Sequence, residues 1–241
     1  MIQPPIRAVL MDMDGTLYHQ GVLRGFMALE LGALPFSTRS SRATRGVWRS
    51  LKAFRRVREE LRRLEAPEVS LATLQYVEAA LRAGEDQAYL ERVVTEWIYQ
   101  RPLKYLRFCK RSGLEAFLTF LDGRGIRVGM FSDYPVEDKL QALGLAGRMS
   151  LTLCATEPAI NAFKPHPKGF LHACALWGVS PDEVLYVGDR PEVDALGAER
   201  AGMSCALLGK GDSRWVPRHT AVRSVVFSSF KGLQHALTSH C

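Results

Sequence analysis

The chain has 241 residues, of which 47% are hydrophobic and 24% are charged. These fractions are ordinary for a soluble globular protein and exclude a disordered or fibrous one, and the length suffices for one large domain or for a core domain with an insertion. The 32 Lys and Arg residues outnumber the 25 Asp and Glu residues, and the resulting net charge of +7 favours an anionic partner.

No apolar run approaches the roughly 20 residues that a membrane span requires. The N-terminal sequence lacks the charged start, apolar stretch and cleavage site of a signal peptide, so we expect a cytoplasmic location. The cysteines are odd in number, scattered and without a CxxC pair, which predicts reduced and mostly buried thiols. They are Cys109, Cys154, Cys174, Cys205 and Cys241.

The first predicted element is a buried strand, an apolar run from Ile6 to Met13 that ends abruptly in acidic residues and a glycine. It delivers the carboxylates of Asp12 and Asp14 to the carboxyl end of the strand. One carboxylate of such a pair can attack phosphorus while the other handles protons, and both attract Mg²⁺. The pair alone is weak evidence, because acids after a strand also form turns and helix caps.

The segment from about Tyr18 to Gln100 is expected to be helical throughout and to interrupt the sheet after its first strand. From Val47 to Leu64 the apolar residues recur every three or four positions, which predicts an amphipathic helix. Two further helices are expected to follow, capped by Ser70 and Asp86.

A basic run without an acidic residue lies in this segment, from Ser37 to Arg58. A solvated helix face is one interpretation, and a site for a polyanionic substrate or partner is the other, because guanidinium groups bind phosphates and carboxylates through paired hydrogen bonds. Nucleic acid is not expected, since no recognisable reading motif accompanies the charge. The basic residues are Arg39, Arg42, Arg45, Arg49, Lys52, Arg55, Arg56 and Arg58.

Strands and helices alternate in the rest of the chain. Further strands are expected at Val128–Phe131, Val184–Val187, Cys205–Leu208 and Val222–Phe227. Helices are expected at Gly113–Arg124, Val136–Leu143, Pro167–Leu176, Glu192–Ala201 and Phe230–Leu237. This alternation predicts an α/β fold with a parallel sheet, in which ligands bind at the carboxyl ends of the strands.

Polar residues that suit phosphate chemistry follow two of these later strands. Ser132 and Asp133 come after one strand, where a hydroxyl group and backbone N–H groups can hold phosphate oxygens. Lys164 lies in a segment that two prolines hold extended, and it can neutralise charge that develops on a phosphoryl group. Asp189 and Asp194 follow another strand and offer metal ligands and a partner for the lysine.

In this order the residues resemble the four motifs of the haloacid dehalogenase superfamily. The matching positions are Asp12-Met13-Asp14-Gly15-Thr16-Leu17, Ser132, Lys164, and Gly188-Asp189 with Asp194. The order of the four motifs is much more specific than any one of them. The spacing of the last motif looks like that of members related to phosphoglycolate phosphatase and to nucleotidase-type phosphatases.

The resemblance implies a Rossmann-like α/β core formed by residues 1–17 and 101–241, with a helical cap of residues 18–100 inserted after the first motif. It also implies that Asp12 is the nucleophile that forms an aspartyl-phosphate and that Asp14 is the general acid and base. Mg²⁺ would bind the Asp12 carboxylate, the Asp14 backbone carbonyl and Asp189.

The resemblance further implies which residues contact the transferring phosphoryl group. Ser132 and Lys164 would bind it, and Asp133 and Thr16 would assist in holding the phosphate. Lys164 would also orient the nucleophile, while Asp194 supports either the lysine or the metal shell.

The expected function is therefore a Mg²⁺-dependent phosphatase acting on a small phosphorylated metabolite. Members of the superfamily that attack carbon lack the second aspartate of the first motif, so the presence of Asp14 sets that activity aside. Two alternatives stay open. One is a phosphomutase or phosphotransferase of the same fold, and the other is a non-catalytic protein that recruits an anionic partner through its basic helix.

Overall fold

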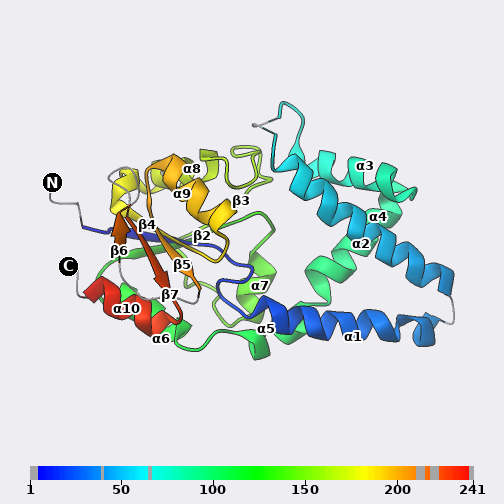
Figure 1. The fold of residues 1–241 in the computed structure, drawn as a ribbon, viewed down its shortest axis with the longest axis horizontal. Coiled ribbons are helices and arrows are strands. Elements are labelled where there is room, and N and C mark those ends of the chain that lie inside the picture. The colour runs from blue at the N-terminus through cyan, green and yellow to red at the C-terminus, as the bar shows by residue number, and fades with distance from the viewer. Residues whose placement is uncertain (1–4, 39–40, 65–66, 210–214, 218–222, 239–241) are drawn as a thin grey trace.

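The computed structural model describes residues 5–38, 41–64, 67–209, 215–217 and 223–238, and Figure 1 shows its fold. Its centre is a seven-stranded sheet with the order β3-β2-β1-β4-β5-β7-β6. Neighbouring strands are parallel except for β6, which pairs antiparallel with β7. The strands are β1 Ala8–Met11, β2 Arg127–Ser132, β3 Leu151–Cys154, β4 Val184–Gly188, β5 Ser204–Leu208, β6 Trp215–Pro217 and β7 Arg223–Phe227.

Helices cover both faces of the sheet (Figure 1). Alternate residues of β1 point to opposite faces, so Ala8 and Leu10 join one hydrophobic cluster and Val9 and Met11 join the other. Helices α8 and α9 contribute to the first cluster, and α6, α7 and α10 contribute to the second. These helices are α6 Leu114–Asp122, α7 Glu137–Ala142, α8 Lys168–Trp177, α9 Leu196–Ala201 and α10 Phe230–Thr238.

The predicted α/β fold with a parallel central sheet is confirmed, and the five predicted strands occur close to their expected bounds. The edge strands β3 and β6 were not predicted. Strand β3 has only four residues and is mostly half-buried, so it lacks the continuous apolar run that marks β1 and β4 in the sequence.

A group of helices follows β1 in the chain and lies beside the sheet in Figure 1. The amphipathic pattern of α2 is confirmed from Val47 to Leu61, where the apolar residues that recur every three or four positions are buried. The predicted end at Leu64 is wrong, because the helix ends at Leu61 and Leu64 is exposed. The elements of this group are α1 Gln20–Thr38, α2 Ser41–Leu61, α3 Leu71–Ala83, α4 Gln87–Val94 and the π-helical turn η1 Thr95–Gln100, after which α5 Leu103–Cys109 returns to the sheet.

The two helix caps predicted in this group turn out differently. Asp86 caps α4, since its carboxylate accepts a hydrogen bond from the backbone N–H of Tyr89 at 3.1 Å. The prediction for Ser70 is wrong, because its side chain makes no capping bond. Asn161 replaces it: its Oδ1 accepts from the backbone N–H of Leu71 at 2.7 Å. A residue 90 positions away thus caps α3, which no local pattern could reveal.

The chain leaves the sheet and returns to it along two adjacent connections. Tyr18 and Lys110 form an isolated antiparallel bridge. The backbone N–H of His19 donates to the carbonyl of Cys109 at 2.8 Å, and that of Arg111 donates to the carbonyl of Leu17 at 3.0 Å. These bonds place the base of the helical group next to the end of β1.

Two predictions from composition can be compared with the described residues. Cys109, Cys154 and Cys174 are free thiols, and Cys109, Cys174 and Cys205 are buried, while Cys241 lies outside the described residues. Within the described ranges, no helix has the length and apolar character needed to cross a lipid bilayer.

Candidate active site

Asp12 lies at the carboxyl edge of the sheet, directly after β1, which is an interior strand between β2 and β4. Its backbone N–H donates to the carbonyl of Val187 in β4 at 2.8 Å, so the sheet itself fixes its place. The side chain is buried, and its Oδ2 accepts a hydrogen bond from the hydroxyl group of Thr16 at 3.3 Å. The nucleophile expected from the sequence is thus rigidly held.

Lys164 reaches the same point from the segment before α8. Its ammonium group lies 2.6 Å from Oδ1 of Asp12 and 2.7 Å from Oδ1 of Asp194. The hydroxyl group of Tyr186 is a third partner at 2.9 Å. All four residues are buried, so the lysine is the cation that compensates two carboxylates away from bulk solvent.

Asp194 supports this arrangement with both of its oxygens. While Oδ1 faces Lys164 and Tyr186, Oδ2 accepts the backbone N–H groups of Asp189 and Arg190 at 3.1 and 3.0 Å. A side chain at Gly188 would overlap with the carboxylate of Asp194, so only glycine fits there. Since its oxygens are already engaged, Asp194 suits the support of Lys164 better than direct metal binding.

Asp14 begins the turn after β1, and its carboxylate contacts residues that the sequence did not point to. The ammonium group of Lys139 in α7 contacts both of its carboxylate oxygens, at 2.6 and 2.8 Å. The hydroxyl group of Tyr18 donates to Oδ1. Both partners are buried, so the Asp14 carboxylate has a fixed orientation.

Asp133 links the loop after β2 to the helical group. One carboxylate oxygen accepts the backbone N–H of Lys164 at 3.1 Å, and the other pairs with the guanidinium group of Arg62. Arg58 donates to the backbone carbonyl of Asp133 at 2.6 Å. The neighbouring Ser132 is buried, and its hydroxyl oxygen accepts the backbone N–H of Tyr134 at 3.2 Å.

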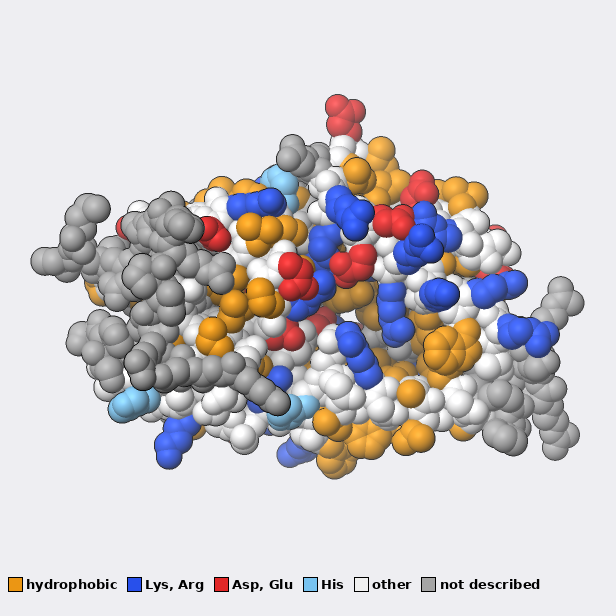
Figure 2. Space-filling model, in the orientation of Figure 1, with side chains coloured by type: hydrophobic (Ala, Val, Ile, Leu, Met, Phe, Trp, Pro, Cys, Tyr) orange, Lys and Arg blue, Asp and Glu red, His pale blue; other side chains and the backbone are white. Residues whose placement is uncertain are grey.

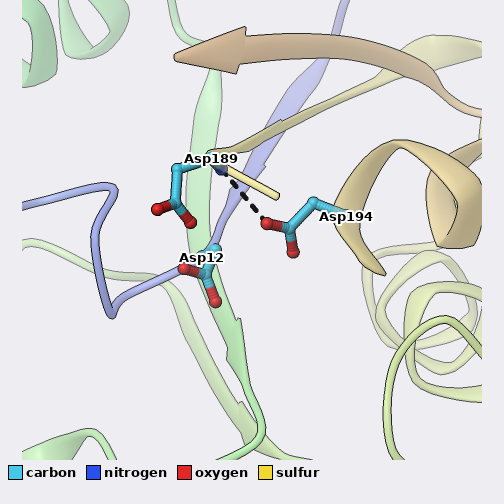
Figure 3. A group of neighbouring side chains, drawn as sticks. All are labelled: Asp12, Asp189 and Asp194. Carbon is cyan, nitrogen blue, oxygen red and sulfur yellow. Dashed lines mark hydrogen bonds between the residues drawn. The ribbon is translucent and has the colours of Figure 1, made fainter. Parts of the chain in front are cut away.

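Three carboxylates lie together at this edge of the sheet, as Figure 3 shows. Oxygen atoms of Asp12, Asp189 and Asp194 lie within 4.8 Å of one another. Among the described residues, Asp189 Oδ1 is a buried oxygen without a hydrogen-bond partner. Gly15, with φ of +100°, leaves room for the Asp189 carboxylate, which any side chain at that position would displace. An unsatisfied buried carboxylate oxygen beside a second carboxylate suits a hard cation such as Mg²⁺.

Burial and ion pairing have opposite effects on the pKa values of the charged groups in the site. Burial raises the pKa of the Asp12 carboxyl, and the nearby Lys164 opposes the rise. Burial opposes the charge of Lys164, but Asp12, Asp194 and Asp133 outweigh it and raise the pKa of the ammonium group. Burial and Asp194 raise the pKa of Asp189 to about 6. A bound cation would favour the ionised form of both carboxylates.

A cavity of about 540 Å³ opens onto these residues and extends between α1, α2 and η1. Asp12, Asp14, Ser132, Asp133 and Lys164 line its inner end. Figure 2 shows a hollow in the middle of one face of the molecule, with both basic and acidic side chains around it. The volume lies within the roughly 300–1,000 Å³ typical of small-molecule sites.

The basic residues of α2 differ in their burial and in their partners. Arg58 is buried and touches the site loop, contrary to a purely solvated face. Arg49 and Arg56 pair with Glu85 and Glu60 on the surface. The side chains of Arg39 and Arg42 lie outside the described residues, and these contacts give no support to a polyanionic partner.

The structure therefore gathers the predicted site residues at the carboxyl edge of the sheet, where all but Thr16 and Asp189 line the cavity, and adds others. Residues not predicted for the site are Tyr18, Lys139, Tyr186, Arg62 and Arg58. The charge of the arginine-rich helix was a signal for Arg58, but its burial depends on a partner 75 positions away. Lys139, a single lysine in a helix seven residues after Ser132, carries no such signal in the sequence.

Residues 6–202 match the haloacid dehalogenase-like hydrolases, and the protein belongs to this family. Solved structures agree with the fold. A structure of a 2-haloacid dehalogenase from Pseudomonas syringae superposes with a TM-score of 0.67, covering 98% of this chain and 100% of that one. Its sequence identity of 20% supports the shared fold and no shared activity.

Curated relatives include several named phosphatases. A phosphoserine phosphatase of Thermus thermophilus is 35% identical over 100 residues, 40% of this chain and 39% of that protein. An N-acetylmuramic acid 6-phosphate phosphatase of Pseudomonas aeruginosa is 28% identical over 189 residues, 76% of this chain and 74% of that protein. The alignment with the Thermus protein spans less than half of its length.

Proposed function

We propose that the protein is a Mg²⁺-dependent phosphatase that hydrolyses a small phosphorylated metabolite through an aspartyl-phosphate on Asp12. The observation that carries this proposal is the buried pair of Asp12 and Lys164, 2.6 Å apart, beside the unpartnered oxygen of Asp189. The relatives named as phosphatases support the same reaction class.

The reaction consists of two displacements at phosphorus. In the first, a carboxylate oxygen of Asp12 attacks, the bond between phosphorus and the ester oxygen breaks, and Asp14 donates a proton to the leaving alcohol. In the second, Asp14 removes a proton from a water molecule whose oxygen attacks the aspartyl-phosphate. Phosphate leaves, and the carboxylate of Asp12 is restored.

Other side chains bind the phosphoryl group and hold the nucleophile. Lys164 neutralises charge on the phosphoryl oxygens, the Ser132 hydroxyl group donates to one of them, and Thr16 orients Asp12. The Asp133 carboxylate is occupied by Arg62 and the Lys164 backbone, so its contribution to phosphate binding is its backbone N–H.

The donor set suits Mg²⁺. The carboxylates of Asp12 and Asp189 and the backbone carbonyl of Asp14 would hold it, and the unpartnered Oδ1 of Asp189 supports this choice. The ion supplies charge neutralisation for the phosphoryl oxygens and for the two acids.

Residues 18–100 are proposed as the cap that covers this site and selects the substrate. Side chains of α1, α2 and η1 line the same cavity as the acids of the sheet edge, which supports that role. Arg62 joins the two parts directly by pairing with Asp133 and by donating to the Lys164 carbonyl at 2.8 Å.

Phosphate release tests the proposal. The protein is incubated with an aryl phosphate and a metabolite panel, with and without Mg²⁺, beside Asp12→Asn and the matched control Asp182→Asn. Asp182 is exposed and precedes β4, so it lies at the opposite edge of the sheet. We expect Mg²⁺-dependent release by the natural protein and the control, and none by Asp12→Asn.

If the natural protein and Asp182→Asn release no phosphate although Mg²⁺ still stabilises them against heat, the protein is not a hydrolase. That result would favour the phosphomutase alternative. Phosphoryl transfer between sugar phosphates is the assay for that activity. Stabilisation by polyanions but not by Mg²⁺ would instead favour the non-catalytic binding protein.

A further inference from the structure

The outer part of the cavity differs in chemistry from its catalytic end. Leu23, Met27 and Leu31 follow one another at every fourth position of α1 and form one wall. Leu51 of α2 and Trp97 of η1 also line this part, and they are packed with Leu31 in one hydrophobic cluster. Binding is favourable when an apolar ligand displaces water from an apolar surface of this kind.

Charge in this outer part is positive. Arg24 and Arg55 line the cavity, are exposed, and have no acidic partner within the described part of the chain. The acid Glu59 also lines it, but Arg62 and Arg190 lie within 3.2 and 3.4 Å of its carboxylate. A positively charged leaving group would therefore find no free acid there.

The size of the cavity exceeds the needs of a phosphate with a short chain. About 540 Å³ is available. On the proposed mechanism, the phosphate would occupy only the end at Asp12 and Lys164. The exposed indole ring of Trp48, 53% accessible, borders the remaining space. Aromatic side chains of this kind pack well against a flat ring of a ligand.

We propose that the substrate is a phosphomonoester whose alcohol carries an apolar, ring-sized group without positive charge, bound between α1, α2 and η1. This inference rests on the proposed phosphatase function and adds the class of substrate. It distinguishes this protein from an enzyme that is selective for short phosphorylated acids or phosphorylated amino alcohols.

The test uses three esters of two-carbon primary alcohols that differ in their end group. Phenethyl phosphate carries a ring, ethyl phosphate carries none, and phosphocholine carries a cation. Because the alcohols are of the same type, differences in kcat/KM report mainly on the outer cavity. We expect phenethyl phosphate to exceed ethyl phosphate by about tenfold or more, and phosphocholine to be no better than ethyl phosphate.

Ala28→Phe tests whether the cavity causes this preference. Ala28 is exposed and lines the cavity, so the added ring narrows it without disturbing the core. The ratio of kcat/KM for phenethyl phosphate to kcat/KM for ethyl phosphate should fall toward one in this variant. Leu29→Phe is the matched control, because Leu29 is 74% exposed and does not line the cavity, and its ratio should stay unchanged.

Equal kcat/KM for phenethyl and ethyl phosphate, or a preference for phosphocholine, would overturn the substrate class and leave the phosphatase function standing. An unchanged ratio in Ala28→Phe would also overturn it. Release from none of the three esters, nor from the wider panel, would overturn the proposed function and the inference with it.

Discussion

The ammonium group of Lys164 lies 2.6 Å from a carboxylate oxygen of Asp12, with both side chains buried. The two residues are 152 positions apart in the sequence: Asp12 follows β1, and Lys164 lies in the loop after β3, where its backbone N–H donates to Asp133 in the loop after β2. Their pairing links fold to chemistry, because a buried carboxylate without a cation would take up a proton and lose its nucleophilic character.

Lys164→Met should therefore reduce phosphate release by at least about a hundredfold, since the variant loses the cation that neutralises the phosphoryl group and Asp12. Lys168→Met is the control, an exposed lysine in the first turn of α8, and it should keep activity near that of the natural protein. Equal activity of both variants, measured on samples whose folding is checked by circular dichroism, would remove Lys164 from the mechanism.

Lys139 is expected to act through Asp14, because its ammonium group contacts both carboxylate oxygens. Lys139→Met should lower kcat by about ten- to a hundredfold, as the proton-transferring group loses its orientation. A double-mutant cycle with Asp14→Asn provides the check. The double variant should be no slower than Asp14→Asn alone, and fully additive losses would show that Lys139 acts independently of Asp14.

Removing the carboxylate of Asp133 should weaken the contact between the loop after β2 and Arg62, which directly follows α2. Burial opposes the charge of Asp133, but Arg62, Lys164 and Arg58 outweigh it and lower the pKa of the carboxyl. Because the folded-state pKa lies below the unfolded value of about 3.9, the stabilisation is complete above that value and is lost as the pH falls through the folded-state pKa. Asp133→Asn should cost about 3 kcal/mol of unfolding free energy near pH 7.

Urea unfolding at several pH values measures this effect. The difference between Asp133→Asn and the natural protein should shrink as the pH falls below about 4. Asp122→Asn, which breaks the exposed pair with Arg148, should cost less than about 1 kcal/mol and serves as the control. A difference for Asp133→Asn that is constant with pH would show that the lost interaction is not ionic.

Gly15 is expected to be irreplaceable because of its neighbour. A methyl group at this position would overlap with the carboxylate of Asp189, so Gly15→Ala should displace that acid and weaken Mg²⁺ binding at least about tenfold. Gly125→Ala is a matched control, since Gly125 also has a positive φ, +66°, but has open space around its Cβ position. Thermal stabilisation as a function of Mg²⁺ concentration distinguishes the two variants. Equal Mg²⁺ affinities would contradict the metal site at Asp189.

Much of the fold could be predicted from the sequence because the relevant signals are local. β1 and β4 are buried on both faces and thus read as continuous apolar runs, and α2 shows one buried stripe. Strand β3 could not be predicted, since a half-buried edge strand of four residues carries little pattern. Asn161 could not be identified as the cap of α3, because that bond depends on tertiary structure.

The same division applies to the candidate site. The acids at the ends of β1 and β4 were predictable, because they follow strands whose carboxyl ends meet at one edge of a parallel sheet. Lys139 and Arg62 were not, since Lys139 reaches its acid from α7 and Arg62 from the turn after α2, and the positions of both helices relative to the sheet are a property of packing. The apolar walls of the cavity likewise depend on how α1 packs against α2.

Direct detection of the covalent intermediate tests the central claim that Asp12 is the phosphorylated group. The protein is mixed with substrate and Mg²⁺, quenched in acid during turnover, digested and analysed by mass spectrometry. The peptide containing Asp12 should carry one phosphoryl group that hydroxylamine removes, and Asp12→Asn should yield neither this peptide nor phosphate. Turnover without phosphorylation of Asp12, or phosphate release by Asp12→Asn at the natural rate, would contradict the mechanism.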